Sequence, residues 1–279
     1  MHGWKKVALA VGVVGALAGA APACILDFGN LTGGAAPGAD GGVPDGGARD
    51  GATEAGAQDG GCPGRGGPNA IRVTTPLGAF CIDATEVTVG QYRAYLAAGG
   101  GASPDPACSG ADAGAPGASC EPLAPSKDAY PVTCVTWCLA CAFCGWAGKR
   151  LCGRIGGGSD AVDAENDPTK SEWMYACTGG SSNAYPYGST FDGTLCNVNA
   201  SATIPAGSRA TCQGGVPGLF DMSGNVEEWV DACQTDSCLA RGGDFSATAA
   251  NAGCTTAIAT MLEFRTAAEN FRGFRCCSN

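Results

Sequence analysis

Histidine and basic residues are scarce in this sequence. Its one histidine is His2, and 16 Lys and Arg stand against 26 Asp and Glu among 279 residues, a formal net charge of -10. A chain without histidine in its body lacks the groups for Ser-His-Asp or Cys-His catalysis and for imidazole ligation of zinc or iron. The acidic balance gives no attraction to phosphate backbones, so we expect no nucleic-acid partner.

Long apolar runs are also few, and the most apolar stretch lies at the N-terminus. Two lysines precede an apolar and small-residue segment that ends in Ala-Pro-Ala at 21–23, the pattern of an export signal. Cleavage there would remove His2 and leave Cys24 first, where bacterial lipoproteins are acylated. We therefore expect a signal peptide over 1–23, a lipid on Cys24 and a membrane-anchored, extracytoplasmic lipoprotein, with a secreted protein as the alternative.

The rest of the chain divides into a tether and one domain. Residues 24–61 are mostly Gly, Ala, Pro and Asp, a composition that buries too little apolar surface to fold, so we expect a disordered linker. Residues 62–279 suffice for one domain with a sizeable core, interrupted by a low-complexity loop from Gly99 to about Ser126. No later segment is apolar enough to span a bilayer, so membrane contact is expected only through the lipid.

Cysteine is abundant, with 18 residues in a chain that carries an export signal. This combination favours a disulfide framework, and lipidation of Cys24 would leave 17 cysteines and at least one unpaired. Cys138, Cys141 and Cys144 also form the C-x2-C-x2-C opening of a [4Fe-4S] ligand run. Because their segment has helical character, disulfides or core positions along one helix side are the favoured interpretation.

Local signals predict three helices. Thr88–Gln91 is a capping box that opens a helix ending near Gly99, and Thr136 caps a helix over Trp137–Trp146. Thr169–Glu172 is a second capping box, for a short helix that stops at Gly179. With the rest rich in Gly, Ser, Asn and Pro, we expect a loop-rich α+β domain with short strands at 71–73, 79–83, 226–230 and 273–276.

A carboxylate cluster surrounds Gly224-Asn225. Asp221, Glu227 and Glu228 could supply oxygen ligands to a hard cation such as Ca²⁺, and a solvated turn is the alternative.

Seven segments follow one another along the chain: FCIDATEVTVGQYRAYL at 80–96, PVTCVTWCLACAFCGWAGKRL at 131–151, SEWMYACTGG at 171–180, YPYG at 185–188, GLFDMSGNVEEWV at 218–230, RGG at 241–243 and GFRC at 273–276. Taken together and in this order, they resemble the formylglycine-generating enzyme or sulfatase-modifying factor family. The resemblance implies a variant of the C-type lectin fold with little regular secondary structure. It also implies disulfides Cys144–Cys276 and Cys177–Cys254, with Cys277 as a competing partner for Cys144.

The resemblance further implies one structural calcium ion. Its ligands would be the side chains of Asp221 and Glu228 and the carbonyls near Met222, Gly224 and Val226. A weaker second site would begin at Asn197 and Val198, although no later acidic ligand is evident for it.

Catalytic members of this family bind copper through two cysteines that follow R-G-G-S. Here Asp244 replaces the serine, Ala247 stands at the first cysteine position, the second falls near Ala252, and Glu227 stands where tryptophan is usual. Cys254 is the nearby cysteine, and the resemblance assigns it to a disulfide. Because Cu(I) requires thiolate ligands, copper is not expected.

We therefore expect a noncatalytic, monomeric binding or structural module with an unknown protein or glycan ligand. The first alternative is an active formylglycine-generating oxidase with rearranged cysteines. The second is an iron-sulfur electron carrier.

Overall fold

The computed structural model describes residues 61–108, 116–117, 123–255 and 261–279. The predicted signal peptide, Cys24, nearly all of the predicted linker and part of the low-complexity loop lie outside these residues. Within them, no helix has the length and apolarity needed to cross a bilayer.

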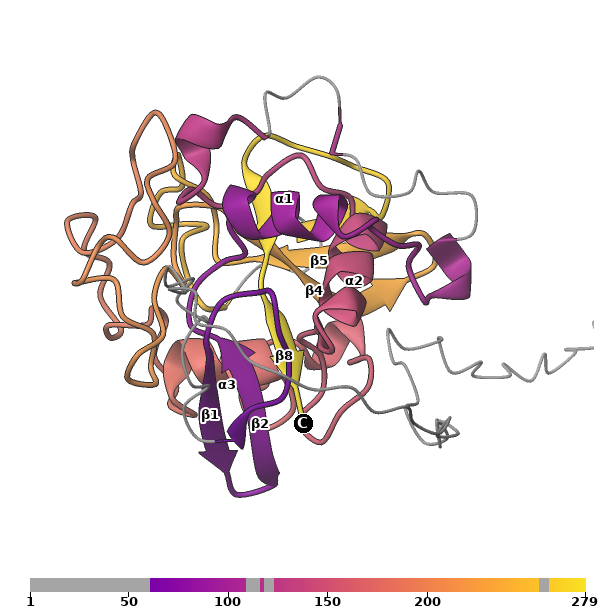
Figure 1. The fold of residues 1–279 in the computed structure, drawn as a ribbon. Coiled ribbons are helices and arrows are strands. Elements are labelled where there is room, and N and C mark those ends of the chain that lie inside the picture. Colours follow the sequence, from indigo (N-terminus) through magenta and orange to yellow (C-terminus); the bar gives the residue numbers. More distant parts are fainter. Residues whose placement is uncertain (1–60, 109–115, 118–122, 256–260) are drawn as a thin grey trace, which may run out of the picture.

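In the described part of the chain, two four-stranded sheets and three α-helices form the fold (Figure 1). The strand order is β1-β2-β8-β3 in the first sheet and β6-β5-β4-β7 in the second, where β4 and β7 run parallel. Irregular chain connects α3 to β4. The elements are β1 Ala70–Thr75, β2 Gly78–Asp83, α1 Val89–Ala97, η2 Pro106–Cys108, η3 Pro125–Lys127, α2 Trp137–Trp146, β3 Arg150–Leu151, η4 Val162–Ala164, α3 Glu172–Thr178, β4 Glu227–Gln234, β5 Ser237–Arg241, β6 Leu262–Phe264, β7 Arg272–Phe274 and β8 Cys276–Ser278.

The first two helices begin where their sequences predict. The Thr88 hydroxyl accepts the Gln91 N–H, and the Gln91 side-chain oxygen accepts the Thr88 N–H, which completes the capping box of α1. The Thr136 hydroxyl accepts the Leu139 N–H at the start of α2. Aromatic side chains join these helices, because Tyr92 of α1 stacks on Phe143 of α2 with ring centroids 5.7 Å apart.

The predicted capping box of α3 is wrong. The cap is Ser171, whose hydroxyl accepts the Met174 N–H, so the helix begins two residues later than a Thr169 cap would place it. The Thr169 hydroxyl instead donates to the Asp167 carboxylate at 2.6 Å, a local turn that competes with helix capping. The helix stops at Gly179 as expected, in the left-handed conformation (φ 64°).

The strand predicted at 273–276 is two strands in different sheets. β7 pairs with β4, whereas β8 pairs with β2 and β3. Arg275 lies between them, fully buried, with its guanidinium on Glu228. The short strands β3, β5 and β6 lack the local signals that predict strands, and their pairing depends on chain segments far away.

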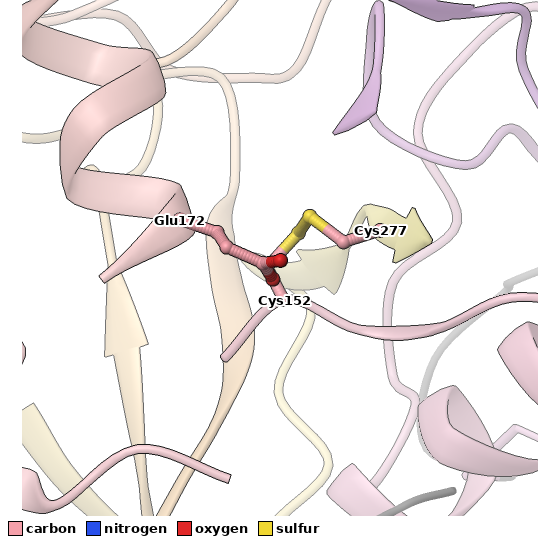
Figure 2. Close-up of side chains that lie close together, drawn as sticks. All are labelled: Cys152, Glu172 and Cys277. Atoms are coloured by element: carbon pink, nitrogen blue, oxygen red, sulfur yellow. A yellow bond between two sulfur atoms is a disulfide. The ribbon is translucent and has the colours of Figure 1, made fainter. Parts of the chain in front are cut away.

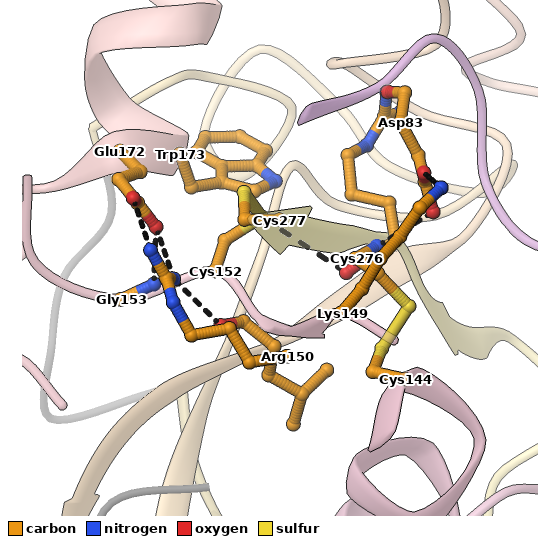
Figure 3. The surroundings of a disulfide bond; sticks show 12 residues. Asp83, Cys144, Lys149, Arg150, Cys152, Gly153, Glu172, Trp173, Cys276 and Cys277 are labelled. Atoms are coloured by element: carbon orange, nitrogen blue, oxygen red, sulfur yellow. Dashed lines mark hydrogen bonds and ion pairs between the residues drawn. A yellow bond between two sulfur atoms is a disulfide. The ribbon is translucent and has the colours of Figure 1, made fainter. Parts of the chain in front are cut away.

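Seven disulfides lie within the described residues, and none of the cysteines there is free. Both pairs implied by the family resemblance are present, and Cys277 binds Cys152 instead of competing for Cys144 (Figure 3). Cys134 and Cys141 are also disulfide-bonded, so the C-x2-C-x2-C run offers no thiolate to an iron-sulfur cluster. The seven are 62–81, 108–138, 144–276, 152–277, 177–254, 196–212 and 233–238.

Candidate functional site

The RGG segment at the end of β5 is anchored in the interior by Arg241. Its guanidinium is fully buried, donates to the Glu165 carboxylate at 3.2 Å and to the Cys254 carbonyl at 2.6 Å, and lies over the Trp173 ring. Gly243 follows with φ 69°, and a Cβ there would lie 2.5 Å from the Asn251 carbonyl oxygen. The backbone after β5 therefore turns tightly toward 247–254.

Apolar methyl groups occupy the positions at which the family would place copper ligands. Ala247 is 1% exposed and Ala252 is 0% exposed, and both pack in a cluster with Tyr185, Cys196, Val198 and Cys212. Their backbones are also engaged, because the Ala247 carbonyl accepts the Asn199 N–H and the Ala252 carbonyl accepts the Ser223 hydroxyl. Neither position can supply a thiolate.

The remaining candidate residues at this site are engaged by other partners. Cys254 is fully buried and disulfide-bonded to Cys177 of α3. Asp244 accepts the Ser246 N–H with one carboxylate oxygen, which closes a local turn. Glu227, in the tryptophan position, accepts both Nε and Nη2 of Arg272, and burial raises the pKa of this carboxyl.

Aromatic side chains border the same region. The Tyr185 hydroxyl donates to the Ala249 carbonyl at 2.6 Å, which holds the YPYG turn against the segment after RGG. Its ring stacks on Tyr187 at 5.5 Å, and Phe191 lies tilted against it at the same distance. Tyr187 and Phe191 are both partly exposed, so this side of the site presents aromatic surface to solvent.

Glu228, the predicted calcium ligand on β4, is occupied by other partners. Arg275 Nη2 donates to one carboxylate oxygen at 2.6 Å, and Arg275 Nε donates to the other at 2.7 Å. Trp173 Nε1 also donates to the second oxygen at 2.8 Å. A bidentate arginine and an indole N–H satisfy this carboxylate without a metal.

Asp221, the other predicted carboxylate ligand, remains incompletely bonded. It has φ 57° and is 1% exposed. Oδ2 accepts the Gly207 N–H at 2.6 Å, Oδ1 is buried with no other donor beside it, and the Asp221 and Glu86 carboxyls lie close enough to hydrogen-bond each other. Glu86 Oε2 is likewise buried with no other donor beside it, while its Oε1 accepts Asn225 Nδ2. Burial first and then the Asp221 charge raise the pKa of Glu86 well above its usual range.

The structure thus divides the predicted calcium set. Asp221 and Glu86, a residue outside the predicted ligand set, offer two buried carboxylate oxygens, which suit a hard cation. Glu228 is instead paired with Arg275. The sequence offered only a weak signal for Glu86, because it lies 135 positions before Asp221 in the segment that precedes α1. The Arg275 guanidinium bonds to Glu228, and its charge also acts on Glu86 and Asp221, so these three acids interact with one base.

The weaker predicted site adjoins the first one. A Cβ on Gly224, whose φ is 77°, would lie 2.4 Å from the Asn197 carbonyl oxygen and 2.6 Å from Val198, so the two segments are in close contact. The Asn197 carbonyl accepts the Asn225 N–H, and its side-chain amide donates to Asn225 Oδ1. Met222 and Val226 are fully buried beside this turn.

A third group of possible ligands is Cys152, Glu172 and Cys277 (Figure 2). Their ligand atoms lie within 4.8 Å of one another. The two sulfurs form a disulfide, and both Glu172 oxygens accept Arg150 at 2.6 Å (Figure 3). We therefore interpret this group as structural.

Comparison with known proteins agrees with this architecture. The family model described as sulfatase-modifying factor enzyme 1-like domain matches residues 43–279, and the chain belongs to that family. Its loop-rich, disulfide-stabilised α+β fold is the family's variant of the C-type lectin fold. A crystal structure of CarF is similar over 78% of this chain and 96% of its own, with 21% identity and a TM-score of 0.48.

Two curated relatives differ in the activity that their names state. Inactive C-alpha-formylglycine-generating enzyme 2 of Bos taurus is 31% identical over 53% of this chain and 50% of its own length. Formylglycine-generating enzyme of Mus musculus is also 31% identical, over 36% of this chain and 26% of its own length. The chain thus spans half or less of these relatives, and equal identity to both leaves activity to be judged from the site.

Proposed function

We propose that this protein is a noncatalytic member of its family that acts as a binding or structural module outside the cytoplasm. The observation that carries the proposal is the loss of both copper thiolates, with buried Ala247 at one position and buried Ala252 near the other. Cys254, the cysteine nearest to them, is held in a disulfide with Cys177. Without thiolates, the site has no ligand set for Cu(I) and no reduced cysteine pair for oxidase chemistry.

The oxidase test uses a C-x-P-x-R peptide with copper and oxygen. We expect no aldehyde product and no Cu(I) binding in competition with a chelator, with an active formylglycine-generating enzyme as the positive control. An Ala247→Cys, Ala252→Cys variant tests whether thiols at these positions restore Cu(I) binding. Aldehyde formation by the unchanged protein would refute the noncatalytic proposal.

The disulfides indicate an oxidising compartment, which agrees with export. We further propose that a lipid on Cys24 anchors the protein to a membrane. Intact mass of the native protein should exceed that of the cleaved polypeptide by a lipid-sized increment. A Cys24→Ser variant should lose that increment and appear in the soluble fraction. A native mass equal to the bare polypeptide beginning at residue 24 would contradict anchoring and favour a secreted form.

We propose that the aromatic surface formed by Tyr187 and Phe191, next to the buried Ala247 and Ala252, contacts the ligand. Tyr187 and Phe191 are partly exposed, and aromatic rings with nearby polar groups suit protein or glycan partners. A glycan array with the full chain is the first screen. Tyr187→Ala should abolish any signal, whereas Phe264→Ala, which removes a 68% exposed ring on β6, should leave it unchanged. Signals that are insensitive to Tyr187→Ala would place the contact elsewhere.

We also propose that Asp221 and Glu86 hold one structural Ca²⁺, assisted by backbone carbonyls near Gly224. Support comes from two buried carboxylate oxygens that receive no hydrogen bond from any other group and from an excess of acids over bases around them. When bound, the cation would supply the positive charge that this buried cluster lacks. Because the pKa of Glu86 is raised, calcium must displace a proton, and its affinity should increase with pH.

Calorimetry with Ca²⁺ in two buffers of different ionisation enthalpy measures that proton release. Calcium should raise the melting temperature of the unchanged chain and of Asp192→Asn, an exposed control, but not that of Asp221→Asn. A melting temperature that neither EDTA nor added calcium changes would eliminate the calcium proposal. The noncatalytic proposal does not depend on it.

A further inference from the structure

The disulfide Cys233–Cys238 differs from the others in its place in the fold. It joins directly opposed residues of the β4–β5 hairpin, next to the pair Gln234 and Ser237 at the turn. Its sequence separation is 5, whereas the other six disulfides between described residues have separations of 16 to 132. The turn itself is exposed from Gln234 to Asp236.

Access to the sulfur atoms also differs. Cys233 is partly exposed, whereas every other cysteine in the described ranges is buried, including its own partner Cys238 at 0%. Thiol–disulfide exchange requires in-line approach of an external thiolate to one sulfur, so a buried disulfide reacts only after local opening. In the folded domain, Cys233 is therefore the most exposed of the described cysteines.

The hairpin should remain folded while this disulfide is open. In the chain-entropy model, a disulfide that closes a short loop contributes least to the stability of the fold. Beyond a register shift between Trp229 and Cys233, the β4–β5 ladder resumes at Trp229–Ala240 and Glu228–Arg241, and β5 also pairs with β6. These hydrogen bonds keep positions 233 and 238 opposite each other, so the bond can form again without refolding.

The surroundings of Cys233 are charged. It lines a cavity of about 30 Å³ together with Arg265, Asp105 and Asp231. Arg265 Nη2 donates to the Thr235 carbonyl in the hairpin turn, and its Nε is buried without a hydrogen-bond partner. The two carboxylates accept local hydrogen bonds, Asp105 from the Ala107 N–H and Asp231 from the Ser159 hydroxyl. The cavity that Cys233 lines thus contains one guanidinium and two carboxylates.

We propose that Cys233–Cys238 is a thiol–disulfide exchange site for a dithiol reductant. One thiolate of the reductant attacks Cys233 Sγ, forms an intermolecular disulfide and breaks the Cys233–Cys238 bond, and Cys238 leaves as a thiolate that takes up a proton. The second thiol of the reductant then displaces Cys233. Two electrons pass to the protein, which ends with two thiols, and the reductant ends as a disulfide. This site lies on the hairpin and uses none of the residues that replace the copper ligands.

The first experiment exposes the native full chain to dithiothreitol, quenches with acid, alkylates and maps the labelled cysteines. We expect Cys233 and Cys238 to be labelled more than about tenfold faster than Cys196 and Cys212, a control disulfide with the next shortest separation and two buried sulfurs. Circular dichroism should show native structure at the stage where only this pair is labelled. Earlier labelling of another pair, or simultaneous labelling of all pairs, would overturn the proposal.

Two single variants form a matched pair that does not depend on reduction. Cys238→Ser leaves the partly exposed Cys233 free, and Cys233→Ser leaves the buried Cys238 free. With glutathione disulfide as the probe, Cys238→Ser should form a mixed disulfide and Cys233→Ser should not. Equal modification of both variants, or modification of Cys233→Ser alone, would show that Cys233 is not the entry point.

Discussion

Because of the buried carboxyl of Glu165, the unfolding free energy of this domain should decrease as the pH rises from mildly acidic to mildly alkaline. Glu165 is fully buried after η4, where one oxygen accepts Ser171 and Arg241 and the other has no hydrogen-bond partner. Burial, opposed by the Arg241 charge, raises its pKa from 4.5 to about 7. The native state therefore binds this proton more tightly than the unfolded chain does.

The sign and the size of the stability change follow from the raised pKa of Glu165. Because the folded-state value is raised, the contribution to stability is fully present below about pH 4.5 and is lost as pH rises through about 7. A shift from 4.5 to about 7 corresponds to about 3 kcal/mol of unfolding free energy between those limits. For a domain of this size, that change lowers the melting temperature by roughly 6–12 °C.

Thermal denaturation of the disulfide-intact protein from pH 4.5 to 8.5 measures this dependence. Glu165→Gln removes the titration, so its melting temperature should fall less with pH than that of the unchanged chain. Asp163→Asn, which alters an exposed carboxylate two residues earlier, should keep the full dependence. Other buried carboxyls with raised pKa values, such as Asp83 and Glu227, act in the same direction, so the difference between variants is the quantity to compare. Identical pH slopes for Glu165→Gln and the unchanged chain would refute the reasoning.

Three further substitutions test individual contacts by thermal denaturation. Gly243→Ala places a methyl group 2.5 Å from the Asn251 carbonyl oxygen in a residue with φ 69°, and we expect it to destabilise the domain by about 1–3 kcal/mol. Gly78→Ala is the control, because Gly78 also has a positive φ but open space around its Cβ, so only the smaller backbone effect is expected there. Arg275→Met leaves buried Glu228 without its ion pair and should destabilise by about 3–5 kcal/mol; a loss below 1 kcal/mol would mean that the pair contributes little. Double replacement of Cys144 and Cys276 by Ser should lose about 5 kcal/mol and that of Cys233 and Cys238 about 2 kcal/mol, so equal losses would contradict the loop-length argument.

Local sequence signals were sufficient where a single turn of chain decides the structure. The α1 capping box and the Thr136 cap of α2 depend on atoms three residues apart, and both form as predicted. The α3 prediction failed for the same kind of reason, because Thr169 had a nearer competitor in Asp167. The absence of a cysteine pair after RGG could also be recognised without a structure, because the identity of a possible ligand is given by the sequence itself.

Contacts between distant segments were decided only by the tertiary structure. Glu86 and Asp221 become neighbours through packing of the segment before α1 against the turn before β4, and the charge of Arg275 reaches both. Arg275 also donates two hydrogen bonds to Glu228, the residue that the sequence motif predicts as a calcium ligand. Pairing of Cys277 with Cys152 likewise required the register of β8 between β2 and β3.

The sequence by itself determined the family, the helix starts that depend on local caps and the loss of copper ligands, because each resides in residue identity or short spacing. Only the tertiary structure decided which carboxylates are paired, which remain buried without a partner, and which disulfide a solvent thiol can reach. These properties depend on burial and on distances between segments up to about 190 residues apart, such as Asp83 and Arg275, and no local pattern encodes them.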